Sequence, residues 1–235
     1  MSIQYILFDL DGTLLPMDQD HFVRTYMGLL SAHMVPYGFE SKRFIETIWR
    51  GTGAMFKNDG AVTNETVFWN IFTAAYGPEV RQFEPILDEF YRTRFADVRS
   101  ACGYNAKASQ TVAKLKEMGY KLVLATQPIF PAIATEQRML WAGLDRNLFQ
   151  LYTTYENSNY CKPNPAYYQQ ILNKIGAKAD QCLMVGNDAT EDMVAQTLGM
   201  KVYLLTDCLI NKEGKDLSGY PQGDLDTLLH DIQSM

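Results

Sequence analysis

The chain has 235 residues, and its 21 lysines and arginines against 27 aspartates and glutamates give a formal net charge of -6. This length is sufficient for a buried core without disulfides or a structural metal. The acidic balance argues against nucleic-acid or anionic-membrane binding driven by overall charge. A hydrophobic share of 47% excludes extensive disorder.

The cysteines and the apolar runs indicate the compartment. No C-x-x-C pair occurs among Cys102, Cys161, Cys182 and Cys208, which argues against a disulfide scaffold or a zinc cluster and favours reduced thiols. No apolar run approaches the ~18–20 residues needed to span a bilayer. The first four residues lack the basic region of a signal peptide. We therefore expect a soluble, cytoplasmic protein.

Short apolar runs alternate with helical patterns, as in α/β proteins with parallel sheets. The first run, Tyr5 to Phe8, predicts a strand that leads into Asp9-Leu10-Asp11-Gly12-Thr13. Because the apolar runs are continuous rather than alternating, both faces of the sheet should be covered. Further strands are predicted at 121–126, 182–186 and 201–205, with a weaker one, nearer an edge, at 148–155.

Boundary residues predict helices between these strands. A helix that includes residues 112–118 should end at Gly119, and Asn164-Pro165 should begin a helix that ends at Gly176. Another helix should follow Asp188 and end at Gly199. A short helix at 225–232 follows a polar segment for which the sequence indicates no function.

Residues 17–99 break this alternation, because they show helical periodicity and no convincing buried strand. We predict a core made of residues 1–16 and 100–235, and an inserted helical domain at 17–99. Glycines at 51–53 and 58–60 should divide the insertion. Residues 50–57 are then either a flexible specificity loop or a simple surface connection, while Tyr26 and Met27 are expected to pack helices together. Such an insertion can move as a lid over a site at the strand ends.

Candidate functional side chains follow the ends of the predicted strands, where open α/β sheets bind ligands. Asp9 and Asp11 share one turn after the first strand. Two carboxylates within ~4 Å repel by about 4 kcal/mol at an effective dielectric constant of 20. Such a pair therefore favours a bound cation, of which Mg²⁺ is the natural choice beside phosphate. A turn with capping aspartates is the simpler alternative.

Three other strand ends carry candidates. Thr126, with the turn at Gln127, could hold an anionic oxygen, or it could be an ordinary strand threonine. Lys162 lies in a loop with two prolines and would balance the carboxylates, although a solvated lysine is the alternative. The acidic turn at 186–192 could join Asp9 and Asp11 at a metal, or could simply cap the helix that follows it.

In this order, four pieces resemble the motifs of the haloacid dehalogenase superfamily of hydrolases. They are Asp9-x-Asp11-Gly12-Thr13, Thr126, Lys162-Pro163 and Gly186-Asn187-Asp188-x-x-x-Asp192. The match runs from residue 5 to about 206, and residues 17–99 look like the family's alpha-helical cap. The resemblance implies a doubly wound, Rossmann-like core with the Asp9 strand at its centre. It also implies a Mg²⁺-dependent phosphatase that acts on a small phosphorylated metabolite.

The resemblance further implies roles for individual residues. Asp9 is the nucleophile that forms an aspartyl phosphate, and Asp11 protonates the leaving oxygen and then activates water. Thr126 binds the transferring phosphoryl group with help from Gln127, and Lys162 stabilises the same charge and orients Asp9. Asp9 and the backbone carbonyl of Asp11 ligate the metal.

The fourth motif departs from the family pattern. The residue after the glycine is usually Asp in this family, whereas here it is Asn187. An amide oxygen ligates a hard cation more weakly than a carboxylate does. We therefore predict Asp188 as the acidic metal ligand, with Asp192 in support through water or Lys162.

Three other functions share parts of this pattern. Dehalogenases of the family generally lack the second Asp and need no metal. Sugar phosphomutases are a closer alternative, distinguished by their need for a sugar bisphosphate. Receiver-type signalling proteins also use a phosphorylated Asp beside Thr and Lys, but they are shorter and lack a large insertion. A binding protein without turnover is a related possibility.

Overall fold

The computed structural model describes residues 2–233 and contains one six-stranded sheet in which every pairing is parallel. The strand order is β3-β2-β1-β4-β5-β6. The predicted doubly wound fold is confirmed, with the Asp9 strand inside the sheet and the weakest predicted strand at an edge. The strands are β1 (Tyr5–Phe8), β2 (Lys121–Leu124), β3 (Phe149–Tyr152), β4 (Cys182–Gly186), β5 (Lys201–Leu205) and β6 (Gln222–Gly223).

The register of the central strands brings the motif residues to one edge of the sheet. Phe8 at the end of β1 pairs with Leu124 of β2 and with Val185 of β4. The loops that begin at Asp9, after β2 and after β4 therefore leave the sheet side by side. The strand order reverses between β1 and β4, which is where ligands bind in open α/β sheets.

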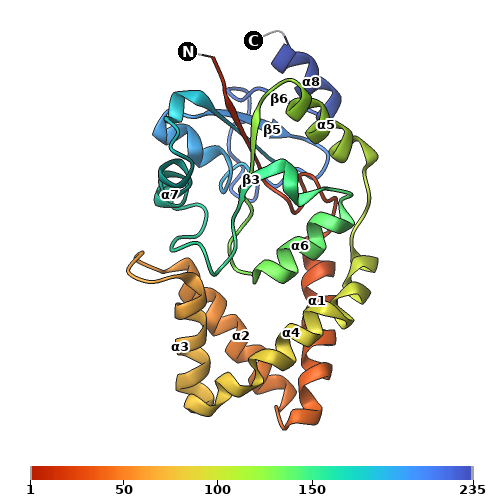
Figure 1. Cartoon of the computed structure of the whole chain (residues 1–235), viewed down its shortest axis with the longest axis vertical. Coiled ribbons are helices and arrows are strands. Elements are labelled where there is room, and N and C mark those ends of the chain that lie inside the picture. Colours follow the sequence, from red (N-terminus) through yellow and green to blue (C-terminus); the bar gives the residue numbers. More distant parts are fainter. Residues whose placement is uncertain (1, 234–235) are drawn as a thin grey trace.

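Helices cover both faces of the sheet (Figure 1). Ile6 and Phe8 belong to one hydrophobic cluster and Tyr5 and Leu7 to another, as expected when successive strand residues point to opposite faces. This explains why the apolar runs of the sequence are continuous. The core helices are α5 (Ala106–Glu117), α6 (Ala132–Trp141), α7 (Pro165–Ile175) and α8 (Leu225–Gln233).

The boundary signals of α7 act as predicted, and after β4 the end signal does so but the predicted start does not. The Asn164 side chain caps α7 by accepting the Ala166 N–H, and Gly176 ends the helix with a φ of 66°. The helix predicted between Asp188 and Gly199 forms only as a short 3₁₀ helix, η6 (Met193–Leu198), which ends at Gly199 as predicted, with a φ of 87°. The preceding residues are held in a tight turn whose N–H groups bind the Asp188 carboxylate.

The insertion forms the lower half of the molecule in Figure 1. Where it joins the core, Met17 pairs with Cys102, and the Gly103 N–H donates to the Pro16 carbonyl at 2.7 Å. The two connecting segments therefore lie side by side. The helices of the insertion are α1 (Gln19–Met34), η1 (Val35–Tyr37), α2 (Ser41–Phe56), α3 (Asn64–Tyr76), η2 (Pro78–Phe83), α4 (Glu84–Arg92) and η3 (Arg94–Ala101).

The break predicted at the glycines of residues 51–53 is wrong, and with it the flexible loop at 50–57. Helix α2 continues through these residues to Phe56. A Cβ at Gly51 would lie 2.7 Å from Cδ2 of Phe68, so the glycine allows α2 and α3 to pack closely. Glycine in a helix costs about 1 kcal/mol relative to alanine, and this packing offsets that cost.

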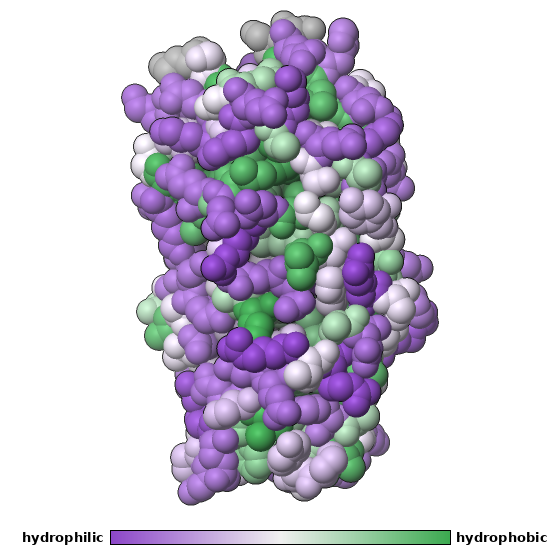
Figure 2. Space-filling view, turned by 45° about the vertical axis from the view of Figure 1, so that its right-hand side comes forward, coloured by the Kyte–Doolittle hydropathy of each residue, from purple (hydrophilic) through white to green (hydrophobic). Residues whose placement is uncertain are grey.

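The outer face in Figure 2 is mostly hydrophilic, with hydrophobic residues in separate patches. Across residues 2–233, no helix combines the length and the apolar character that crossing a membrane requires.

Candidate active site

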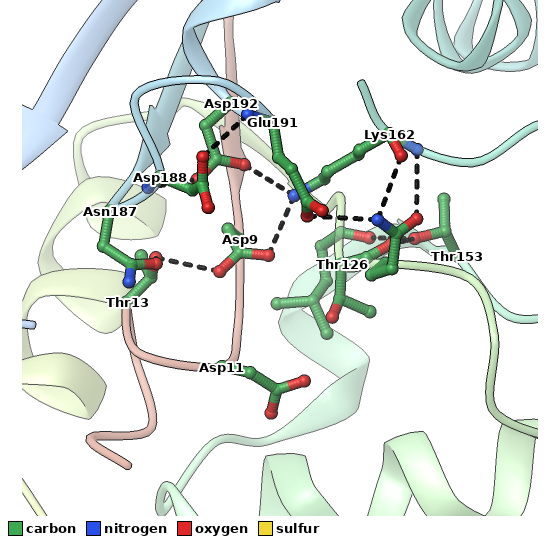
Figure 3. Close-up of polar contacts among 12 residues, drawn as sticks. Asp9, Asp11, Thr13, Thr126, Thr153, Lys162, Asn187, Asp188, Glu191 and Asp192 are labelled. Carbon is green, nitrogen blue, oxygen red and sulfur yellow. Dashed lines mark hydrogen bonds and ion pairs between the residues drawn. The ribbon is translucent and has the colours of Figure 1, made fainter. Parts of the chain in front are cut away.

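Asp9 lies directly after β1, where its carboxylate is held by two side chains (Figure 3). Oδ1 accepts a hydrogen bond from Lys162 Nζ at 2.8 Å, and the Thr13 hydroxyl lies 2.9 Å from Oδ2. The Asp9 side chain is about 10% exposed, so it remains reachable from one side. A carboxylate that is fixed at both oxygens and open on one side is well placed to act as a nucleophile.

Lys162 joins the loop before α7 to the loops after β1 and β4. Its Nζ also donates to Asp192 Oδ1 at 2.7 Å, and its side chain is only 1% exposed. Burial lowers the pKa of Lys162, but the neighbouring Asp192 and Asp9 outweigh it and raise the pKa well above its usual value. Lys162 is therefore a permanent cation between two carboxylates.

Gly186 is required for this arrangement. A Cβ at this position would lie 2.1 Å from Oδ2 of Asp192. The same oxygen accepts the Asp188 N–H at 3.0 Å, so Asp192 both pairs with Lys162 and stabilises the turn after β4. Asp192 therefore acts as a positioning residue for Lys162.

Asn187 and Asp188 face different partners. The Thr13 hydroxyl lies 2.8 Å from Asn187 Oδ1, while Asn187 Nδ2 donates to the Cys208 carbonyl at 2.7 Å. Oδ1 of Asp188 accepts the N–H groups of Thr190 and Glu191 at 2.7 and 2.9 Å. The structure therefore aims the Asn187 amide oxygen toward Asp9 and uses one oxygen of Asp188 to hold its own turn.

Thr126 and Gln127 follow β2. Thr126 Oγ1 is buried and has no hydrogen-bond partner among the described residues. The Thr126 carbonyl accepts hydrogen bonds from Thr153 Oγ1 at 2.7 Å and from the Tyr167 hydroxyl at 2.8 Å, which fixes the threonine. A fixed, unsatisfied hydroxyl is suited to bind an anionic oxygen.

Gln127 connects the Lys162 loop to Glu191. Its side-chain amide exchanges hydrogen bonds with the backbone N–H and carbonyl of Lys162 and donates to Glu191 Oε2 at 3.0 Å. Burial raises the pKa of Glu191 to about 7, against the opposing charge of Lys162. Gln127 thus positions Lys162 through the backbone of Lys162.

Asp11 lies apart from this network in Figure 3 and has a partner that the sequence did not indicate. Its Oδ2 forms an ion pair with Arg138 of α6, whose side chain is 0% exposed. Asp11 Oδ1 is buried and has no partner within residues 2–233. Burial raises the pKa of Asp11, while Arg138 opposes the rise. One oxygen is thus anchored and the other is available to carry a proton.

The donors at this edge of the sheet fit a hard divalent cation. In the described part of the chain, no three Asp, Glu, His or Cys side chains converge as a metal site, so a ligand set must include amide or backbone oxygens. Thr13 has one hydroxyl proton and two acceptors, Asp9 Oδ2 and Asn187 Oδ1. One of these two oxygens is therefore left without a donor, and oxygen atoms are the ligands that Mg²⁺ prefers.

The site opens into a cavity of about 240 Å³ between the sheet edge and the insertion. Asp9, Asp11, Asn187 and Asp188 line one end of it, and Gln127 lies in its wall. Tyr26 and Met27, which we expected only to pack helices, also line this cavity. Residues from the core and from the insertion thus enclose a single space.

Comparison with protein families identifies the chain. The model of the haloacid dehalogenase-like hydrolases matches residues 3–195. The chain belongs to this family. The resemblance drawn from the motifs is thereby confirmed, and the protein is a haloacid dehalogenase-like hydrolase.

Individual members of the family are similar over most of the chain. Pyrophosphatase PpaX from Bacillus cereus (strain AH820) is 25% identical over 201 residues, which cover 86% of this chain and 82% of that protein. The 2-haloacid dehalogenase from Pseudomonas syringae pv. Tomato DC3000 has a TM-score of 0.63 at 19% identity, covering 99% and 98% of the two chains. The HAD-hydrolase YfnB from Bacillus subtilis, solved bound to magnesium, has a TM-score of 0.55 at 16% identity and covers 99% of each chain.

Proposed function

We propose that this hydrolase is a Mg²⁺-dependent phosphatase that cleaves a small phosphate monoester through an aspartyl phosphate on Asp9. One observation carries the proposal: Asp9 and Asp11 line the same cavity, and each is paired with its own buried cation, Lys162 or Arg138. Two carboxylates held in different environments can take different roles, one as a nucleophile and one as an acid and base. The relative named a pyrophosphatase supports hydrolysis at phosphorus.

In the first half of the reaction, an oxygen of Asp9 attacks phosphorus and the bond from phosphorus to the alcohol oxygen breaks. Lys162 and Thr13 hold the Asp9 carboxylate for this attack. Thr126 Oγ1, which lacks a partner among residues 2–233, donates to an oxygen of the transferring group. Asp11 gives its proton to the departing alcohol oxygen, as its raised pKa favours.

In the second half, a water molecule attacks the phosphorus of the aspartyl phosphate and transfers a proton to Asp11. The bond from phosphorus to Asp9 breaks, which releases inorganic phosphate and restores the Asp9 carboxylate. Asp11 is again protonated, so the cycle is closed. A carbon–halogen hydrolase would have no use for this second carboxylate, which is why we favour phosphate esters.

Mg²⁺ would be held by Asp9, by the backbone carbonyl of Asp11 and by Asp188, with Asn187 as the alternative ligand. When bound, it neutralises phosphoryl charge beside the nucleophile. The magnesium-bound structure of YfnB supports this choice of metal. We further propose that residues 17–99 act as a cap that closes the cavity over the substrate.

Release of inorganic phosphate from p-nitrophenyl phosphate, with Mg²⁺ and with EDTA, tests the proposal. We expect Mg²⁺-dependent turnover without a sugar bisphosphate, and its loss in Asp9→Asn but not in the matched control Asp207→Asn, whose side chain is exposed. Activity that survives Asp9→Asn would remove the nucleophile assignment. A phosphoprotein that accumulates without turnover would instead indicate a switch.

A further inference from the structure

The cavity above Asp9 and Asp11 is walled mainly by apolar side chains of the insertion. These side chains come from α1, α2, α3 and α4. The loop that follows β2, which belongs to the core, adds further apolar side chains. This contrasts with the mostly hydrophilic outer face in Figure 2. The aromatic side chains of the cavity wall include Tyr26, Trp49, Phe68, Trp69, Tyr91 and Phe130.

All charged side chains in the cavity wall are acidic, and none of the lining residues is lysine or arginine. The two cations nearest the reaction centre are already engaged, since Lys162 pairs with Asp9 and Asp192, and Arg138 pairs with Asp11. At the end of the cavity formed by the insertion, Asp88 of α4 adds negative charge, while Glu84 of α4 is paired with Arg81 at 3.3 Å. The acidic lining residues are Asp9, Asp11, Glu84, Asp88, Asp188, Glu191 and Asp192.

We infer, on the basis of the proposed phosphatase function, that the substrate is a phosphate monoester of a bulky, uncharged, apolar or aromatic alcohol. A leaving group of this kind gains stability by burying apolar area against the aromatic wall. A second anionic group would lose its hydration and would meet carboxylates instead of cations. The cavity therefore selects against esters that carry a carboxylate or a second phosphate.

The volume is large enough for an aromatic leaving group beside the phosphoryl group. An apolar cavity of about 150 Å³ is enough to bind benzene, and this cavity measures about 240 Å³. The same reasoning separates this chain from the relative named a pyrophosphatase, because pyrophosphate would place a second phosphate where the lining offers no basic side chain.

A matched pair of substrates tests the inference. 4-Carbamoylphenyl phosphate and 4-carboxyphenyl phosphate have nearly the same shape and differ in one charge. We expect kcat/KM to be at least about thirtyfold higher for the neutral amide, given the strength of charge repulsion in a partly buried site. We also expect 1-naphthyl phosphate to be a better substrate than pyrophosphate. Equal efficiency within the pair, or a preference for pyrophosphate, would overturn the inference.

Binding to the Asp9→Asn protein, measured by calorimetry with the same compounds, separates this inference from the proposed function. A preference for the neutral ester in binding to this variant, together with no turnover of either ester by the wild-type protein, would retain the inference and reject the phosphatase. Turnover with no preference in kcat/KM or in binding would retain the phosphatase and reject the inference.

Variants of α4 test whether the acidic charge of the cavity wall selects the substrate. Asp88 lines the cavity, whereas the adjacent Glu89 is exposed and does not. We expect Asp88→Lys to raise kcat/KM for the carboxylated ester by about tenfold or more, with the control Glu89→Lys unchanged. An unchanged ratio between the two esters in Asp88→Lys would show that the charge of the wall does not select the substrate.

A variant of α2 tests the apolar wall separately. Trp49 lines the cavity but is 50% exposed, so its removal should leave the fold intact. We expect Trp49→Ala to raise KM for 1-naphthyl phosphate by about five- to tenfold through lost apolar contact, with little effect on ethyl phosphate. Leu140→Ala, an exposed residue outside the cavity wall, is the control. Equal effects on both esters would contradict an aromatic leaving-group site.

Discussion

Arg138 and Asp11, 127 positions apart in the sequence, form an ion pair beside the cavity. The guanidinium is completely shielded from solvent, and it also lies 4.4 Å from the centre of the Phe130 ring. Asp11 is 19% exposed. The pair therefore fixes Oδ2 of Asp11, while Oδ1 has no hydrogen-bond partner among the described residues.

Arg138 is predicted to be a positioning residue for Asp11. Under the proposed mechanism, in which Asp11 protonates the leaving oxygen, Arg138→Met should lower kcat for alkyl phosphates by about 10²-fold or more. Dinitrophenyl phosphate, whose leaving group needs no proton, should be affected much less. The measurement is the dependence of kcat on the pKa of the leaving alcohol, with partial recovery expected in Arg138→Lys. A uniform loss across all esters, matched by unfolding, would show a purely structural role; the exposed Arg146→Met is the control.

Lys162 is predicted to stabilise the folded state as well as to support catalysis. Lys162→Met would leave Asp9 and Asp192 buried without their cation, and removal of one partner from a buried pair typically costs about 3–5 kcal/mol. Urea denaturation should show this loss, and the double variant with Asp192→Asn should recover part of it. Lys107→Met, which breaks an exposed pair with Asp226, should change stability little. Equal midpoints for Lys162→Met and wild type would contradict the buried pair.

Glu191 is predicted to make the metal-free protein less stable as the pH rises. Its pKa is raised from 4.5 to about 7 in the folded state, mainly by burial. Between these values the folded protein holds a proton that the unfolded chain releases, so the free energy of unfolding falls as the pH rises, by at most about 3 kcal/mol in total. Above about pH 7 this loss is complete. Denaturation in EDTA from pH 4 to pH 8 should show a smaller decline for Glu191→Gln than for the exposed control Glu117→Gln; identical declines would refute the assignment.

Asp188 is predicted to matter more than Glu191 for the metal requirement. Asp188→Ala should raise the Mg²⁺ concentration for half-maximal activity about tenfold or more, since a lost ligand typically weakens a metal site strongly. Glu191→Ala should shift it far less, because the Glu191 carboxylate contacts Gln127. Identical Mg²⁺ titrations for the two variants would contradict Asp188 as the ligand, and Asn187→Ala would then be the next variant to titrate.

Local sequence was enough to predict five of the six strands, because strands buried on both faces are continuous apolar runs. The short strand β6, made of Gln222 and Gly223, carries no such signal and was not predicted. Parallel strands place their carboxyl ends at one edge, so the approach of Asp9 to Lys162 also follows from the order of the motifs. After β4 the same local signals predicted the end of the helix at Gly199 but not its start or type, because a turn around Asp188 precedes a short 3₁₀ helix. They also failed at Gly51, since a glycine that breaks a helix and one that admits Phe68 look alike in sequence.

The family, five of the six strands and the order of the motif residues could be predicted from the amino-acid sequence, because each of these depends on contiguous residues. Only the tertiary structure decided that Arg138 pairs with Asp11 and that Trp49, Asp88 and Tyr26 enclose one cavity. These contacts join helices whose spacing depends on how whole side-chain surfaces pack. The function of a charged or aromatic side chain here therefore depends on which groups the packing of the helices places opposite it across the cavity.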